Sequence, residues 1–105
     1  MNIQIIGDNF NVSQSTKDLV EEKVGKRLDK LLTKFAPEMK IVLMHIEKDK
    51  FDNLHINLDM NLPGKEHIFA NTSHKILESG LIHLAEETEK QIKKYKDKLA
   101  NYSLG

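Results

Sequence analysis

The stretch at residues 54–62 reads LHINLDMNL, and apolar and polar residues alternate along it without a break. Its apolar positions are Leu54, Ile56, Leu58, Met60 and Leu62. A period of two sends successive side chains to opposite faces of a β-strand. The stretch therefore predicts a strand with one buried and one wet face, as is typical of an antiparallel sheet.

Three further strands are predicted around this one. PGK at 63–65 is typical of a hairpin turn, and EHIFA at 66–70 follows it as a short strand. Upstream, KIVLMHIEK at 40–48 places Val42, Met44 and Ile46 on one side of a strand. NIQII at 2–6 alternates in the same way, with Ile3 and Ile5 on one face.

Two other segments have helical spacing. Ser13 can cap a first helix through its side-chain oxygen, and Pro37 ends the pattern that follows. The apolar residues of this helix are Val20, Val24, Leu28, Leu31 and Phe35. NTS at 71–73 opens a longer second helix, whose predicted inner face carries Leu77, Leu81, Leu84, Thr88, Ile92, Tyr95 and Leu99.

The predicted order is strand, helix, three strands, helix. A four-stranded sheet with both helices packed on one face buries both apolar stripes and leaves the polar strand face in water. The sequence shows no repeat, linker or low-complexity segment. We therefore expect an α+β fold and a single domain over residues 1–105.

Composition excludes several classes of protein. The 105 residues hold 16 basic and 16 acidic side chains and no cysteine, so neither disulfides nor thiolate chemistry is possible. No apolar run approaches the ~20 residues of a membrane span, and no signal peptide is visible at the start. No nucleophile with a nearby base, phosphate loop or carboxylate pair stands out. We expect a cytoplasmic protein that is not an enzyme and has no cofactor, small-molecule substrate or membrane partner.

Basic residues recur at helical spacing in both predicted helices. In the first, Lys23, Arg27, Lys30 and Lys34 form one ladder, roughly 90° around the helix from the apolar stripe. In the second, Lys90, Lys94 and Lys98 form a ladder, with Lys93 and Lys96 on its flanks. Three acidic residues precede this ladder in the sequence.

These ladders have two interpretations. Lysines near a helix C-terminus interact favourably with the macrodipole and stabilise the helix by ~0.3–1 kcal/mol each. This interpretation explains the lysines of the second helix better than those of the first. Alternatively, helices on one side of a sheet bring both ladders to one surface that binds phosphates. Because aromatic residues are few (6%), such a surface would read the backbone and shape of structured RNA.

Two other kinds of site are weighed against RNA binding. His45, His55 and Asp59 form a possible metal set, although their spacing matches no metal motif and a solvated strand face has the same composition. His74 and His83 are predicted as isolated helix residues. A protein-binding or self-associating module is the main alternative, with apolar side chains of the second strand, Ile41 and Leu43, facing outward.

Four segments in the correct order resemble the ribosome hibernation-promoting factor family, which includes the ribosome-associated translation inhibitor. They are MNIQIIGDNFNVSQSTKDLVEEKVGKRLDKL at 1–31, VLMHIEK at 42–48, MNLPGKE at 60–66 and KQIKKYKDKL at 90–99. The resemblance implies the same order of strands and helices, in a fold related to double-stranded-RNA-binding domains. It implies non-catalytic binding to the small ribosomal subunit near the decoding centre, where bacterial members block messenger and transfer RNA sites during stasis.

The resemblance also implies site residues. Basic positions that match the family are Lys17, Lys23, Lys26, Lys90, Lys94 and Lys98, and the helical wheel adds Arg27, Lys30, Lys93 and Lys96. Glu87 stands where some members carry a lysine. Only six residues follow Leu99, so we expect the short, ribosome-pairing subtype rather than one with an inhibitory tail or a second, dimer-forming domain.

Overall fold

A computed structural model describes residues 1–35 and 41–104, with side chains as far as Leu99. Pro37, predicted to end the first helix, lies outside the described residues. The strands are β1 (Asn2–Asp8), β2 (Ile41–Lys48), β3 (Leu54–Leu62) and β4 (Glu66–His74). The first helix consists of α1 (Gln14–Val20), the π-helical turn η1 (Glu21–Gly25) and α2 (Lys26–Leu31), and the last helix is α3 (Leu77–Leu104).

The four strands form one mixed sheet in the order β1-β2-β3-β4. β2, β3 and β4 are antiparallel neighbours, with Val42 opposite Met60 and Met60 opposite Ile68. β1 runs parallel to β2, because the chain between them crosses back through the first helix. The predicted strand at 54–62 is β3, an inner strand with its apolar side chains buried.

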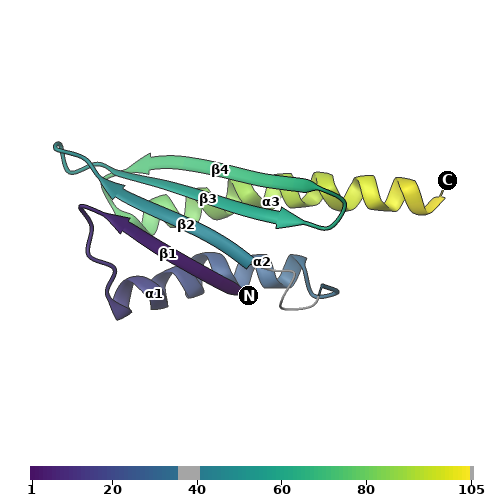
Figure 1. The fold of residues 1–105 in the computed structure, drawn as a ribbon, viewed down its shortest axis with the longest axis horizontal. Helices are drawn as coiled ribbons and strands as arrows, with labels where there is room; N and C mark the ends of the chain where they lie inside the picture. Colours follow the sequence, from purple (N-terminus) through teal and green to yellow (C-terminus); the bar gives the residue numbers. More distant parts are fainter. Residues whose placement is uncertain (36–40, 105) are drawn as a thin grey trace.

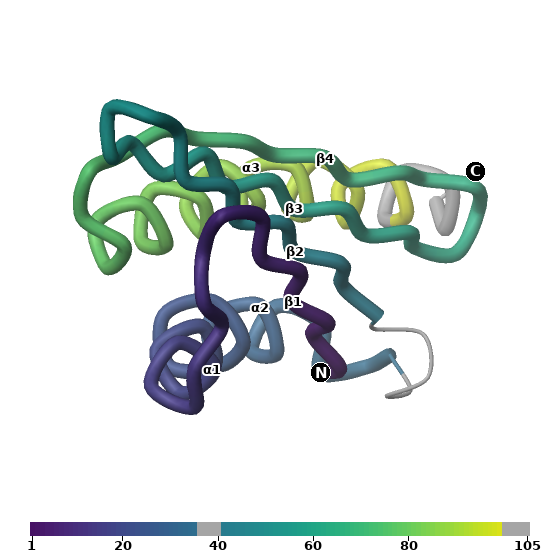
Figure 2. Tube along the Cα trace, turned by 60° about the vertical axis from the view of Figure 1, so that its left-hand side comes forward, coloured from purple at the N-terminus to yellow at the C-terminus, as the bar shows by residue number. Residues whose placement is uncertain are grey.

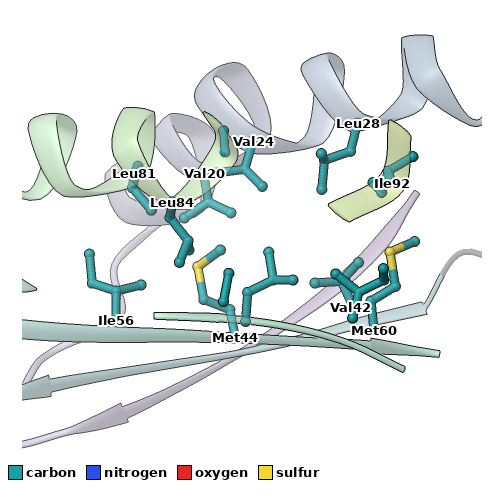
Figure 3. Packing of buried hydrophobic residues seen from close by; sticks show 14 of the residues in the cluster. Val20, Val24, Leu28, Val42, Met44, Ile56, Met60, Leu81, Leu84 and Ile92 are labelled. Atoms are coloured by element: carbon teal, nitrogen blue, oxygen red, sulfur yellow. The ribbon is translucent and has the colours of Figure 1, made fainter. Parts of the chain in front are cut away.

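Both helices cover the same face of the sheet (Figure 1). Figure 2 shows α3 running along β3 and β4, with α1 and α2 on the β1 side. Between the layers, apolar side chains from both helices point at those of the sheet (Figure 3), among them Val20, Val24, Leu28, Leu81, Leu84 and Ile92 against Val42, Met44, Ile56 and Met60. The predicted α+β fold is confirmed, as is the packing of both helices on one face.

The boundary between β4 and α3 differs from the prediction. β4 continues to His74 instead of ending at residue 70, and α3 begins at Leu77 rather than at the NTS segment. The reason is pairing: Asn71 and Ser73 lie opposite Asn57 and His55 of β3. Backbone pairing along the whole of β3 outweighs the local preference of Asn, Thr and Ser for a helix start.

The first helix begins as predicted, because the Thr16 amide donates a 3.2 Å hydrogen bond to Ser13 Oγ. Its buried stripe then repeats at strict intervals of four residues: Val20, Val24, Leu28 and Leu32. In a uniform α-helix of about 100° per residue, Leu32 would be rotated about 120° from Val20. The wider π turn absorbs this drift. Leu32 is therefore fully buried, whereas Leu31, the predicted core residue, is only half-buried.

The end of α3 extends past the sheet (Figure 1). Leu99, predicted on the inner face, is consequently 41% exposed, while Thr88, Ile92 and Tyr95 are buried as predicted. Tyr95 Oη donates to the carbonyl of Pro63 over 2.9 Å and fixes α3 against the β3–β4 hairpin. In the described part of the chain, no helix has both the length and the apolar character that crossing a membrane requires.

Candidate nucleic-acid interface

Charged side chains join the first helix to α3. Lys23 Nζ lies 3.3 Å from Glu78 Oε1, and Arg27 Nη2 lies 2.7 Å from Glu89 Oε2. The hydrogen bond from Arg27, together with its charge, keeps the pKa of Glu89 below its usual value. The side chains of Lys23 and Arg27 are 26% and 37% exposed. These two members of the predicted ladder therefore face α3 and form ion pairs with it.

We call the pairs Lys23–Glu78 and Arg27–Glu89 the helix seam, and a hydrogen bond from a side chain to the backbone extends it. Lys96 Nζ donates a 3.0 Å hydrogen bond to the carbonyl of Leu31, near the end of α2. Lys93 Nζ approaches Glu89 Oε1 at 3.9 Å, so it lies beside the Arg27–Glu89 pair. The predicted ladder, roughly 90° from the apolar stripe, thus meets acidic residues of α3 at Lys23 and Arg27, which a helical wheel could not show because it carries no information about the adjacent helix.

Four other lysines face away from the sheet. Lys26 and Lys30 flank the buried Leu28 by two residues, and Lys90 and Lys94 flank the buried Ile92 in the same way. A separation of two residues is about 160° around a helix when measured the shorter way, so each lysine lies nearly opposite the core. We call Lys26, Lys30, Lys90 and Lys94 the helix platform.

The helix platform is exposed and largely unpaired. Lys26, Lys30 and Lys94 make no ion pair with any described residue, and Lys90 pairs with Glu87 at 3.3 Å. Because the seam joins the two helices, the lysines of both helices lie on one surface of the helix layer. The structure thus brings together four of the predicted site residues.

Lys17 and Lys98 lie at the margins. Lys17 lines a cavity of about 270 Å³ beside β1, together with Ile3, Ile5 and Val20. Lys98 Nζ pairs with Glu66 Oε1 of β4 at 3.1 Å. Neither belongs to the surface formed by the helix platform.

The length of α3 bears on the macrodipole interpretation of its lysines. The helix continues to Leu104, and its last turn contains no basic residue. The influence of a helix dipole on side chains falls off within the last turn. Since five lysines and a single acid, Asp97, occupy the segment from Lys90 to Lys98, the macrodipole does not explain their clustering.

The proposed metal set does not converge. His55 Nε2 lies 2.8 Å from Asp49 Oδ2, whereas Asp59 Oδ1 lies 2.5 Å from His67 Nε2. Within the described ranges, no three His, Cys, Asp or Glu side chains are placed to share a metal ion. His74 also differs from the prediction: it belongs to β4, and its ring meets that of His83 edge-on at 5.8 Å.

Ser73, His55 and Asp49 form a hydrogen-bonded chain that sequence reasoning missed, because residues from three segments contribute to it. Ser73 Oγ lies 2.7 Å from His55 Nδ1. Asp49 also accepts from the amides of Phe51 and Asn53. Hydrogen bonding from His55, and then from these amides, lowers the pKa of Asp49 to about 2. The side chains of His55 and Asp49 are 43% and 26% exposed, and Asp49 organises the turn after β2 through its hydrogen bonds to Phe51 and Asn53.

The family model described as Sigma 54 modulation protein / S30EA ribosomal protein matches residues 3–100. A ribosomal subunit interface protein from Coxiella burnetii has a similar structure, with a TM-score of 0.70 and 22% identity, over 92% of this chain and 99% of the other. The N-terminal domain of Protein Y from Thermus thermophilus gives a TM-score of 0.71 at 20% identity, over 90% and 99%.

At such low identity the two structures support the fold, whereas the family match covers nearly the whole chain. The resemblance inferred from four short segments is confirmed by this match. The chain belongs to the Sigma 54 modulation protein / S30EA ribosomal protein family.

Proposed function

We propose that this protein binds the small ribosomal subunit near the decoding centre, occupies the space of messenger and transfer RNA, and keeps idle ribosomes inactive during stasis. The observation that carries the proposal is the helix platform, a shared surface of exposed lysines on a protein whose net charge is zero. The family description names a ribosomal protein, and the similar protein from Coxiella burnetii is named for the interface of ribosomal subunits.

The basic residues divide into two roles in this proposal. Lys26, Lys30, Lys90 and Lys94 contact phosphates of ribosomal RNA, because an exposed, unpaired ammonium group releases counterions when it binds. Lys23 and Arg27 keep the two helices at a fixed spacing through Glu78 and Glu89, so they position the platform. Lys17, Lys93 and Lys98 extend the contact at its margins.

A rigid arrangement of cations suits a structured RNA. The helix seam and the buried core fix the lysines relative to one another, so little conformational entropy is lost when they meet a matching set of phosphates. Few aromatic side chains are available for stacking on single-stranded bases. The protein is therefore expected to recognise the shape of folded ribosomal RNA, without catalysis and in the cytoplasm.

We further propose that this protein pairs ribosomes into inactive dimers, as its resemblance to the family implies. The second candidate function, a protein-binding or self-associating module, is favoured by exposed apolar side chains on the other face of the sheet, at Ile41 and Leu43. Because the two surfaces lie on opposite faces, the second function is compatible with RNA binding by the first.

Co-sedimentation with purified small subunits tests the proposal. Replacing Lys26 and Lys94 with glutamate should weaken binding more than tenfold at ~100 mM salt, because two phosphate contacts become repulsions. The matched control is Lys50→Glu with Lys65→Glu, which makes the same change of charge at exposed turns of the sheet. Equal binding by the two double variants would refute the platform, and a native chain that never sediments with subunits would refute the function.

A further inference from the structure

The sheet face opposite the helices carries an unusual set of charges. Each strand presents four alternate side chains on this outer face, and the register aligns them in four rows. None of these sixteen positions is lysine or arginine, although the chain has 16 basic residues. The ionisable residues that do occur there are Asp8, Glu47, Asp59, His45, His55 and His67.

Large apolar side chains are exposed on the same face. Leu43 and Phe69 lie in one row on either side of Asp59, and Ile41 precedes Leu43 by two residues on β2. Ile6 lies on the adjacent strand, diagonal to Leu43. These apolar residues are 39–50% exposed, and we call them, with Asp59, the outer patch. Neighbouring exposed apolar side chains of this kind mark interaction surfaces.

Two carboxylates near the outer patch lack a cation. Asp8 and Glu47 occupy directly opposite positions on β1 and β2, an arrangement in which like charges destabilise a sheet. Neither carboxylate pairs with a basic side chain among the described residues. A basic side chain from a partner would relieve this repulsion.

We propose that the outer patch docks a protein segment that presents lysine or arginine side chains next to apolar ones. The apolar residues supply contact area, and Asp8, Glu47 and Asp59 supply complementary charge. Nucleic acid does not fit, because the three carboxylates repel phosphates and none of the sixteen outer positions is a lysine or arginine. A second copy bound through the same face fits less well, because the sixteen outer positions offer no lysine or arginine to pair with the carboxylates.

This inference rests on the proposed function in one respect: with the helix platform on RNA, the outer patch faces away from that RNA and is free for protein. The molecule would then bridge two kinds of partner, with ribosomal RNA on the helix layer and a basic protein segment on the sheet. Charge is sorted between the two faces so that neither partner fits the wrong one.

Site-specific photo-crosslinking on purified small subunits tests the docking surface. A benzophenone amino acid at Leu43 should crosslink to protein, within a segment that contains lysine or arginine, whereas the same probe at Lys94 should crosslink to RNA. Asp8→Lys with Glu47→Lys should reduce the protein crosslink at least fivefold while co-sedimentation is retained. Asp18→Lys with Asp52→Lys makes the same change of charge elsewhere and should leave the crosslink unchanged.

Each contrary outcome overturns the proposal. A Leu43 probe that labels RNA, a second copy of the chain or nothing, on subunits that do bind the protein, would show that the outer patch is not a protein-docking surface. A protein crosslink that is insensitive to Asp8→Lys with Glu47→Lys would remove the charge argument. A chain that does not sediment with subunits would refute the proposed function first, and the docking surface would fall with it.

Discussion

Replacing Leu32 with alanine tests the π turn that sets the direction of every side chain in α2. Leu32 is completely buried, so the substitution removes three buried carbons and leaves a cavity in the core. Substitutions of this kind cost about 3–5 kcal/mol in well-packed cores. Leu31 is half-buried, and we expect Leu31→Ala to cost only about 1 kcal/mol. The predicted difference between the two variants is therefore at least about 2 kcal/mol.

Urea unfolding monitored by circular dichroism measures both changes. With a slope of about 1–1.5 kcal/mol per molar, Leu32→Ala should shift the urea midpoint by about 2–5 M, and Leu31→Ala by about 1 M or less. The slope should not change, since both variants unfold from the same native state. A larger loss for Leu31→Ala than for Leu32→Ala would mean that the helix is uniform, and the π turn would then not set the direction of the side chains in α2.

Three further outcomes are expected. Lys94→Ala should reduce the slope of log affinity against log salt by about 0.9. Arg27→Ala should change this slope much less, because Glu89 already neutralises that arginine. Binding titrations from ~50 to ~200 mM salt measure both slopes, and equal changes would contradict the two roles. Asp49 has a lowered pKa, so its contribution to stability is complete above its ordinary pKa of 3.8 and is lost as the pH falls toward about 2. Thermal melting should show that the native chain melts at a higher temperature than Asp49→Asn, and that this difference shrinks as the pH falls across that window. A difference in melting temperature that stays constant would contradict the assignment. Gly25→Ala should raise the free energy of unfolding by about 0.5–1 kcal/mol, because the three atoms nearest to a β-carbon there all belong to the movable carboxylate of Glu21. A loss above about 1 kcal/mol would show that this carboxylate is fixed.

The sequence is most informative where a pattern is local. Alternation at residues 54–62 and at 42–46 identifies two inner strands, because a strand buried on one face must repeat with a period of two. Ser13 marks the first helix start for an equally local reason, its hydrogen bond to the next turn. These features define the sheet and the two apolar stripes, and therefore the α+β fold.

Features that depend on distant residues are not visible in such patterns. The extension of β4 to His74 depends on pairing with His55 and Leu54, which are far away in the sequence. Leu32 is in the core in place of the predicted Leu31 because of a π turn, which a helical wheel of constant pitch cannot represent. Both errors come from treating an element as if it folded alone.

The candidate site divides in the same way. Lys90 and Lys94 could be placed on an exposed face from spacing alone, whereas Lys26 is predicted from the family resemblance and Lys30 as part of a ladder beside the apolar stripe. The ion pair between Arg27 and Glu89 could not be predicted, because it requires the relative position of two helices that are separated by three strands in sequence. The absence of basic residues from the outer sheet face emerges only when the register assigns each strand residue to a face.

Electron cryomicroscopy of the protein bound to purified small subunits is the most direct test of how its basic helices act. The map should place the helix layer on ribosomal RNA near the decoding centre, with the ammonium groups of Lys26, Lys30, Lys90 and Lys94 within hydrogen-bonding distance of phosphates. Density with the sheet face against RNA, or with the protein bound at another part of the subunit, would contradict the account.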